Sequence, residues 1–412
     1  MLFLFFIESA RAEVWPFNYD TEFAKQSIKP EILRTRTITP VFEKLSKKGA
    51  LAKYSITSVM YTNKAMTSTL CSTFPYPADW TVEAEKMIYK KCLPKLLKEN
   101  MFKTAFIQPA QDFERGKKVI KNTGFEQTTF FNDDFRDKFP STNYFGPADK
   151  DILPFVADWV DDRISNQENF FLTYITNSNH HPFTPSKNWP KRDYIRQDSP
   201  EPEKETIRDY LNSVSYIDSF IGDFTNEFES RGLMNSTLFV FVGDHGYSWG
   251  EHGNPEQVQN SHDNLFRVPM LLYTENEKYK PLLEGKTIEG RRGNIDVLPT
   301  ILDFLNPNFT FDTRFEYGYE GNSVLHPDLG KPQISFSNPG FSSAQFRQYG
   351  LKMNYNPKTF TFKFFDIEKD PYEKQELDLY LYEGGRFKDF QEYAKNALWG
   401  HIEKVNALFD SK

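Results

Sequence analysis

The stretch Phe239-Val240-Phe241-Val242-Gly243-Asp244-His245-Gly246 decides the fold class, because it joins a wholly apolar run to a turn that bears a carboxylate and an imidazole. Such an apolar run is typical of a buried strand. An aspartate beside a histidine on a glycine-flanked turn can present both side chains to one cation. A loop of solvated polar residues is the alternative. The metal site is favoured because a second histidine follows in Gly250-Glu251-His252-Gly253.

Other apolar runs extend this pattern over most of the chain. One long amphipathic run, Thr206–Arg231, carries apolar residues every three to four positions and predicts a helix that lies on a sheet. Strands that alternate with helices predict a three-layer α/β/α sandwich with a mainly parallel central sheet, and ligands gather at the carboxyl ends of such strands. Besides Leu238–Val242, we expect buried strands at Leu2–Ile7, Thr104–Ile107, Phe170–Ile175 and Val268–Tyr273.

The pattern changes beyond about residue 325. Short alternating aromatic segments such as Lys358–Phe365 lead into the turn-like Glu368–Pro371. This sequence pattern predicts a small antiparallel subdomain, closed by a helix near Phe387–Phe409. We therefore expect a catalytic α/β domain over residues 1–325 and a C-terminal α+β subdomain over residues 326–412.

Composition limits the classes of partner. The 412 residues are 39% hydrophobic and 26% charged, a balance that suits a globular protein. A net charge of -7 without a long Lys/Arg run argues against nucleic acid as the main partner. An anionic ester remains compatible, because a metal site sets its own local field. No run of about 18 uncharged apolar residues is long enough to span a bilayer.

The first residues could be mistaken for a signal peptide. Met1–Ile7 is apolar, and Ala10-Arg11-Ala12 resembles a cleavage site. We reject this interpretation because the apolar run is short, lacks a basic leader and is followed by Glu8. A buried first strand fits better, and any natural upstream signal or anchor would then be absent from this chain.

Two carboxyl-end positions add candidate ligands and a candidate nucleophile. Glu8 directly follows the first strand, where a carboxylate is exposed, paired or metal-bound because burying it alone is costly. Thr62 lies between the strand-like Tyr54–Val59 and a probable helix. Its hydroxyl could cap that helix, or it could attack an anion held at the helix start if a cation lowers the pKa of the hydroxyl.

Further histidines are candidates for substrate contact. Asn179-His180-His181-Pro182-Phe183 follows the Phe170–Ile175 strand. One of its histidines could touch a substrate oxygen or donate a proton to the leaving group, although structural histidines are frequent. His262, in Ser261-His262-Asp263, could serve a second metal or contact a phosphate.

The two cysteines, Cys71 and Cys92, leave two possibilities open. They could be buried free thiols, or they could form a disulfide, which would imply an oxidising compartment. Their spacing alone does not decide between them.

Taken together, these motifs resemble the sulfatase-type domain of the alkaline-phosphatase superfamily. The resemblance covers nearly the whole chain in family order. It rests on the Glu8 strand and on the segments Phe239–Gly246, Gly250–Gly253, Arg267–Met270, Asp296–Thr300, Phe365–Ile367 and Asp370–Glu373. The C/S-x-P-S-R signature of true sulfatases is missing. In its place, Thr62-Asn63-Lys64-Ala65 is similar to the threonine nucleophile segment of lipoteichoic-acid synthases and related phosphoglycerol or phosphoethanolamine transferases.

The resemblance implies a set of site residues. The ligands of one divalent ion (Mn, Mg, Zn or Ca, with a second ion possible) would be Glu8, Thr62, Asp244 and His245, with Thr62 also the nucleophile. His180 would contact the substrate, with further contacts expected from Arg115, His181, His252 and His262. Relatives can carry a cysteine pair in this region, which implies a Cys71–Cys92 disulfide. They normally carry an N-terminal membrane domain, which implies an extracellular, periplasmic or lumenal location at a membrane.

The expected function is hydrolysis or transfer of a phosphoglycerol- or phosphoethanolamine-like phosphate ester, lipid- or glycan-linked, through a threonine nucleophile. One alternative is a sulfuric ester hydrolase. Another, of a different class, is an inactive homologue that binds a carbohydrate or a lipid headgroup. The intact set of Glu8, Thr62, Asp244 and His245 speaks against the inactive homologue.

Overall fold

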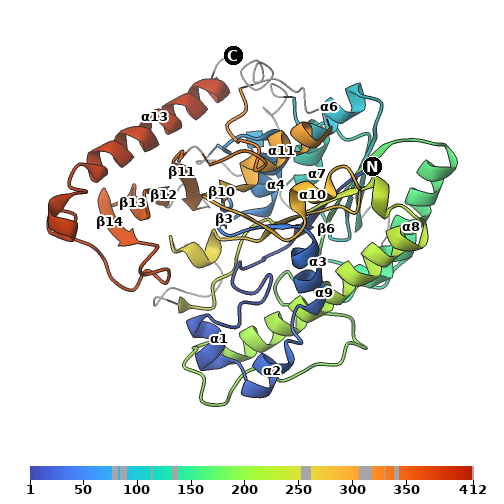
Figure 1. Ribbon diagram of the computed structural model, residues 1–412, viewed down its shortest axis with the longest axis horizontal. Helices are drawn as coiled ribbons and strands as arrows, with labels where there is room; N and C mark the ends of the chain where they lie inside the picture. Colours follow the sequence, from blue (N-terminus) through green and yellow to red (C-terminus); the bar gives the residue numbers. More distant parts are fainter. Residues whose placement is uncertain are drawn as a thin grey trace.

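The structure, a computed structural model, describes residues 1–76, 82–83, 91–112, 115–131, 138–251, 261–305, 318–328, 330–337 and 343–410 (Figure 1). Its main feature is a mixed sheet of eight strands in the order β5-β4-β6-β1-β7-β8-β2-β9. The pairs from β5 to β7 are all parallel, whereas β8 runs antiparallel to both of its neighbours. The strands are β1 (Leu2–Ile7), β2 (Ala50–Ala52), β4 (Lys103–Gln108), β5 (Gln127–Phe130), β6 (Phe170–Ile175), β7 (Leu238–Gly243), β8 (Met270–Tyr273) and β9 (Lys286–Ile288).

The five strands expected from the sequence all belong to this sheet, which confirms the α/β class. Helices cover both of its faces (Figure 1). One face carries α1 (Glu22–Ser27), α3 (Pro40–Lys48), α8 (Asp149–Ser165) and α9 (Lys204–Ser230). The other carries α4 (Thr62–Cys71), α6 (Leu93–Glu99), α7 (Gly116–Asn122), α10 (Lys280–Leu283) and α11 (Val297–Leu305). A further short helix, α2, spans Pro30–Thr35.

Burial on both faces explains why β1 has no polar residue. Phe3 and Phe5 pack with the α9 side, whereas Leu4 and Phe6 pack with the α4 side. Successive side chains of a strand point to opposite faces, so a strand covered twice must be apolar throughout. The predicted helix at Thr206–Arg231 is α9, whose apolar residues lie in the same core as Phe3.

A second sheet lies near the C-terminus, as expected. Its four antiparallel strands are β11 (Gln333–Ser337), β12 (Ser343–Gln348), β13 (Leu351–Asn356) and β14 (Thr361–Asp366). The closing helix is α13 (Phe390–Asp410), which packs on this sheet through a separate apolar cluster (Figure 1). The division of the chain at residue 325 stays a prediction.

The segment Tyr54–Val59 differs from its strand-like prediction. Only β3 (Ser55–Ile56) is a strand, and it pairs with β10 (Arg292–Gly293) rather than with the central sheet. Val59 instead makes a single bridge to Phe336 of β11. The segment therefore pairs with β10 and, through Val59, with β11, which are contacts between distant segments that local sequence does not reveal.

Two further features bear on the site. A disulfide joins Cys71, at the end of α4, to Cys92, just before α6. In the part of the chain that the structure describes, none of the helices combines the length and the apolar character needed to cross a membrane.

Candidate active site

Glu8, Asp244 and His245 meet at the carboxyl edge of the central sheet. β1 and β7 are adjacent and parallel, with Ile7 opposite Gly243, so the next residue of each strand reaches the same point. One ligand atom from each of the three side chains lies within 4.8 Å of the others. His245 Nε2 is 3.6 Å from Glu8 Oε1 and 3.5 Å from Asp244 Oδ2. The sequence expectation that these residues share one place is therefore confirmed.

Thr62 joins this group from a different element. It is the first residue of α4, as the sequence suggested. Its Oγ1 lies 3.3 Å from Glu8 Oε2 and 3.3 Å from His245 Nε2. The N-terminus of α4 adds a partial positive charge at the same place, which favours an anion there.

The oxygens of Asp244 are not used equally. Oδ1 accepts hydrogen bonds from the backbone N–H groups of Ser9 (2.9 Å) and His245 (2.6 Å). Oδ2 is buried, and no described residue donates a hydrogen bond to it. Burial and the nearby Glu8 carboxylate raise the pKa of Asp244 to about 8. Two buried carboxylates this close need a cation if both are to stay ionised, so the residues fit a divalent ion.

The tautomer of His245 supports the same conclusion. Nδ1 lies 2.7 Å from the Gly246 carbonyl oxygen. Because a carbonyl can only accept, Nδ1 carries a proton, and a neutral ring would present the Nε2 lone pair to Glu8, Asp244 and Thr62. Metal-bound histidines commonly donate their second ring N–H in this way. Burial alone would lower the pKa of His245, but the two carboxylates outweigh it and raise that pKa.

A pocket of about 190 Å³ opens beside this group and is lined by Glu8, Thr62 and His180. His180 Nδ1 lies 2.7 Å from the His181 carbonyl oxygen, so its Nε2 also presents a lone pair. Burial lowers the pKa of His180 to about 4, and the ring is neutral at pH 7. The Phe145 ring centroid is 3.8 Å from that of His180, and Phe145 lines the pocket too.

The other predicted substrate contacts are more dispersed. Arg115 is exposed at the start of α7, between the pocket residues Asp112 and Gly116. The ring of His181 packs edge-on against Phe183, and His181 does not line the described pocket. His252 lies outside the described residues.

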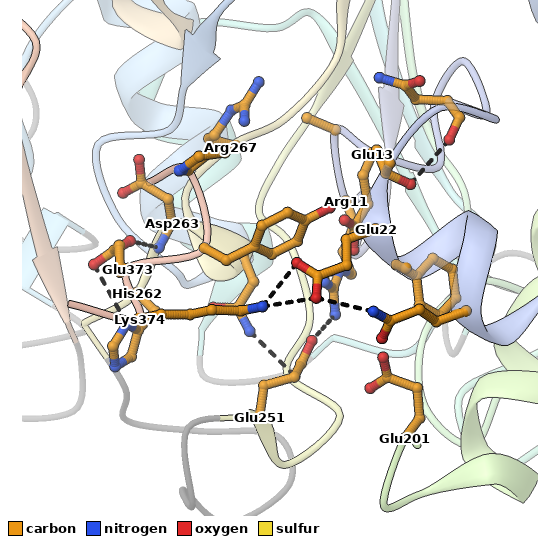
Figure 2. A pocket seen from close by; sticks show the side chains of 18 of the residues that line it. Arg11, Glu13, Glu22, Glu201, Glu251, His262, Asp263, Arg267, Glu373 and Lys374 are labelled. Carbon is orange, nitrogen blue, oxygen red and sulfur yellow. Dashed lines mark hydrogen bonds and ion pairs between the residues drawn. The ribbon is translucent and has the colours of Figure 1, made fainter. Parts of the chain in front are cut away.

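His262 lines a different and larger cavity, of about 600 Å³ (Figure 2). Its Nδ1 is 3.3 Å from Glu373. Lys374 reaches across this cavity to Glu22 at 2.7 Å, and Glu251 is paired with Arg11 (Figure 2). Most charged side chains that line the cavity are thus paired with one another. Such pairing is typical of a place where separate segments of the chain pack together.

Some residues of the site gave no usable signal in the sequence. Asn179 donates through Nδ2 to the Glu8 carbonyl oxygen at 2.7 Å, and its Oδ1 accepts from Ser213 Oγ at 2.7 Å. Ser9 Oγ donates to Glu8 Oε1 at 2.9 Å. Ser9 thus orients the Glu8 carboxylate, whereas Asn179 holds the Glu8 backbone. Asn179 was quoted with the histidines, but its role depends on the pairing of β1 with β6.

Comparisons with known proteins agree with this geometry. The family model described as Sulfatase matches residues 2–307. "Lipoteichoic acid synthase 2" of Bacillus subtilis is 27% identical over 281 residues, which are 65% of this chain and 39% of that protein. An "Arylsulfatase" of Clostridium perfringens is 31% identical over 103 residues, which are 23% of this chain and 19% of that protein. The chain therefore spans about two fifths or less of these relatives.

Solved structures share the fold. The lipoteichoic acid synthase LtaP from Listeria monocytogenes has a TM-score of 0.68 at 19% identity, with 98% of this chain and 92% of that chain covered. A protein in the alkaline phosphatase superfamily from Vibrio parahaemolyticus has a TM-score of 0.70 at 17% identity, with 100% and 88% covered. The family match spans well over half of the chain and includes Glu8, Thr62, Asp244 and His245. The chain therefore belongs to the sulfatase family, and it shares its fold with a solved protein in the alkaline phosphatase superfamily.

Proposed function

We propose that the chain is a metal-dependent phosphohydrolase or phosphotransferase that forms a covalent intermediate on Thr62. The observation that carries this proposal is the position of the Thr62 hydroxyl, 3.3 Å from both Glu8 Oε2 and His245 Nε2 at the start of α4. A threonine that only capped its helix would not need a buried carboxylate and an imidazole beside its oxygen.

Glu8, Asp244 and His245 would hold one divalent ion, with the Thr62 oxygen as a further ligand. A bound ion would lower the pKa of the Thr62 hydroxyl and neutralise charge on the group being transferred. The mixed oxygen and nitrogen donors suit Mn, Zn or Mg, and Ca to a lesser degree.

The chemistry then needs two displacements. In the first, the Thr62 oxygen bonds to phosphorus, and the bond from phosphorus to the leaving alcohol breaks. The proton that Thr62 gives up is returned through solvent to that alcohol. In the second, water or an acceptor alcohol attacks the phosphothreonine, loses its own proton and restores the Thr62 hydroxyl.

The protonation state of His180 favours one of the two roles considered for it. A ring that is neutral at pH 7, with its proton on Nδ1, can accept a hydrogen bond at Nε2 but cannot donate one there. We therefore assign His180 to contact a substrate hydroxyl, or to accept the proton of the second nucleophile, rather than to protonate the leaving group. Arg115 would approach the phosphate from the edge of the pocket.

The charge of the pocket favours a monoanionic ester. Among the described residues that line it, none is a lysine or an arginine, and Asp112 adds a carboxylate. A phosphodiester carries one negative charge and suits this environment better than a doubly charged monoester. A sulfate ester is also a monoanion, so the alternative of a sulfatase is opposed by the threonine nucleophile rather than by charge.

A panel of p-nitrophenyl phosphate, bis(p-nitrophenyl) phosphate and p-nitrophenyl sulfate, assayed with added divalent metal, tests the proposal. We expect the diester to be the best substrate and mass spectrometry to find phosphate on the Thr62 peptide. Preferred turnover of the sulfate would support the sulfatase alternative. Metal-dependent binding of the three esters without turnover of any would support the inactive homologue.

The disulfide and the relatives suggest the setting of this reaction. Cys71–Cys92 fits an oxidising compartment, and we infer an extracellular, periplasmic or lumenal location. The lipoteichoic acid synthase relatives favour a phosphoglycerol- or phosphoethanolamine-like ester, lipid- or glycan-linked, as the substrate. Glu8, Thr62, Asp244 and His245 all lie within residues 1–325, which we propose as the catalytic unit.

A further inference from the structure

A rigid turn displays an aromatic side chain at the edge of the pocket. In the turn Thr142–Gly146, Asn143 Oδ1 accepts from the backbone N–H groups of Phe145 (2.8 Å) and Gly146 (3.1 Å). Gln111 donates through Nε2 to the Tyr144 carbonyl oxygen at 2.7 Å and through its backbone N–H to the Phe145 carbonyl oxygen at 2.8 Å. These bonds fix the backbone on both sides of Tyr144.

Close packing fixes the same turn from below. A Cβ atom on Gly146 would lie 2.0 Å from the Pro109 carbonyl oxygen, so the backbones touch and only glycine fits. The turn is therefore held against the segment that follows β4, which also lines the pocket. Tyr144 has little freedom to move inward without breaking these contacts.

Tyr144 stays 58% exposed although it lies close to the catalytic group. Its ring centroid is 4.5 Å from that of Phe145, whose own ring lies 3.8 Å from His180. Its hydroxyl is 3.4 Å from the His181 carbonyl oxygen, the oxygen that also accepts from His180 Nδ1. Tyr144, Phe145 and His180 thus form a continuous aromatic wall that leads from solvent to the pocket.

The pocket is too small to enclose a large substrate, so part of such a substrate would lie against these aromatic residues. Pockets that enclose a drug-sized ligand usually measure about 300–1,000 Å³, whereas this one measures about 190 Å³. A phosphoryl group with a few carbon atoms fills such a space. The remainder of a larger alcohol must lie outside it, and an exposed ring at the rim offers apolar contact area there.

We propose that the Tyr144 ring is a substrate-contacting, specificity-determining group that binds the C–H surface of a polyol, such as glycerol or a sugar, attached to the phosphoryl group. A polyol presents both C–H surface and hydroxyl groups. Tyrosine suits it because the ring provides an apolar face while its hydroxyl keeps a polar partner, here the His181 carbonyl oxygen. This inference rests on the proposed function of the site.

Calorimetric titration of the metal-loaded protein with two ligands tests the proposal. The ligands are methyl glycerol phosphate, a glycerol phosphodiester, and dimethyl phosphate, which both carry one negative charge and differ in the polyol. For Tyr144→Ala we expect the Kd of the glycerol phosphodiester to rise roughly two- to tenfold while that of dimethyl phosphate stays unchanged. Tyr144→Phe keeps the ring and should stay within about twofold of the wild type for both ligands. Tyr380→Ala, at a tyrosine that is 72% exposed in the C-terminal part, is the matched control and should change neither Kd.

Three outcomes would overturn the assignment of Tyr144. They are an equal rise of both Kd values in Tyr144→Ala, no rise in either, and a Tyr144→Phe variant as impaired as Tyr144→Ala. The first would show that Tyr144 only positions His180, and the last that its hydroxyl carries the effect. Failure of the wild type to bind either ligand, with or without metal, would instead overturn the proposed function itself.

Discussion

The Thr62 hydroxyl lies 3.3 Å from Nε2 of His245, although 183 residues separate the two in the chain. Thr62 begins α4, and His245 follows the end of β7. The Gly246 carbonyl holds a proton on Nδ1 of His245, so Nε2 is the ring nitrogen that faces Thr62 and is available to a bound ion. The proposed nucleophile and the proposed ligands are therefore parts of one group.

Replacement of Thr62 should remove turnover. We expect Thr62→Ala to lower kcat for bis(p-nitrophenyl) phosphate by at least about a thousandfold, because the variant lacks the hydroxyl proposed to form the covalent intermediate. Thr62→Ser keeps the hydroxyl and should retain part of the activity. Thr35→Ala is the control, because that hydroxyl bonds only to its own helix and to Thr37. Unchanged turnover in Thr62→Ala would end the nucleophile assignment.

Removal of metal should have the same effect as loss of a ligand. Treatment with a chelator should abolish turnover, and one of Mn, Zn, Mg or Ca should restore it. Elemental analysis should find about one ion per wild-type chain and much less in Glu8→Gln. Glu31→Gln, at an exposed carboxylate, serves as the control. Full activity after exhaustive chelation would rule out a metal-dependent mechanism.

Asp244→Asn should make the protein more stable than the wild type when metal is absent and less stable than the wild type when metal is bound. Without metal, the variant removes one of two buried carboxylates that repel each other, and the amide oxygen can keep the bonds from Ser9 and His245. Its free energy of unfolding should then rise by roughly 0.5–2 kcal/mol. With metal, the wild type should be more stable, because a bound ion stabilises only the folded state. Thermal unfolding with and without chelator measures both, and equal signs would contradict a shared ion.

The disulfide should stabilise the helix that carries Thr62. Cys71 and Cys92 are 21 residues apart, and closing a loop of about this length typically contributes roughly 2–4 kcal/mol. We expect the paired Cys71→Ser and Cys92→Ser variant to unfold at lower urea concentration than the wild type. A reductant should lower the stability of the wild type but not of the variant. Equal stability of both proteins under oxidising conditions would refute this role.

A buried ion cluster should make the C-terminal sheet sensitive to Asp263. Its carboxylate accepts bonds from Arg347 Nη2 and Lys352 Nζ, both at 2.6 Å, and all three side chains are buried. Asp263→Ala leaves two buried cations short of a partner and should cost about 3–5 kcal/mol. Asp193→Ala, at a more exposed ion pair with Lys29, should cost less than about 1 kcal/mol. Urea unfolding compares them, and similar losses would contradict the assignment.

The same cluster predicts the direction of acid sensitivity. Burial alone would raise the pKa of Asp263, but Arg347 and Lys352 outweigh it and hold that pKa well below its ordinary value. Because the folded-state pKa is depressed, this stabilisation is present above about pH 4 and is lost as the pH falls further. Asp263→Ala should therefore lose less stability than the wild type between about pH 5 and pH 3.

The sequence alone determined the α/β class, the β1 and β7 strands and the proposed ligands that follow them. It could do so because a strand buried on both faces must be apolar throughout, and because parallel neighbours end at one edge of the sheet. The resemblance to a known family then selected Thr62 over its role as a helix cap. These inferences depend on local pattern or on motifs.

Only the tertiary structure decided which distant segments meet. It placed His262 in a cavity apart from the pocket beside Thr62, paired β3 with β10, and set the Tyr144 hydroxyl beside the His181 carbonyl oxygen. It also joined Asp263 to Arg347 and Lys352. The local sequence pattern predicts none of these contacts, because each depends on packing between elements far apart in the chain. Local sequence propensity determines whether a segment forms a helix or a strand. The packing of the shared core determines which distant segments it contacts.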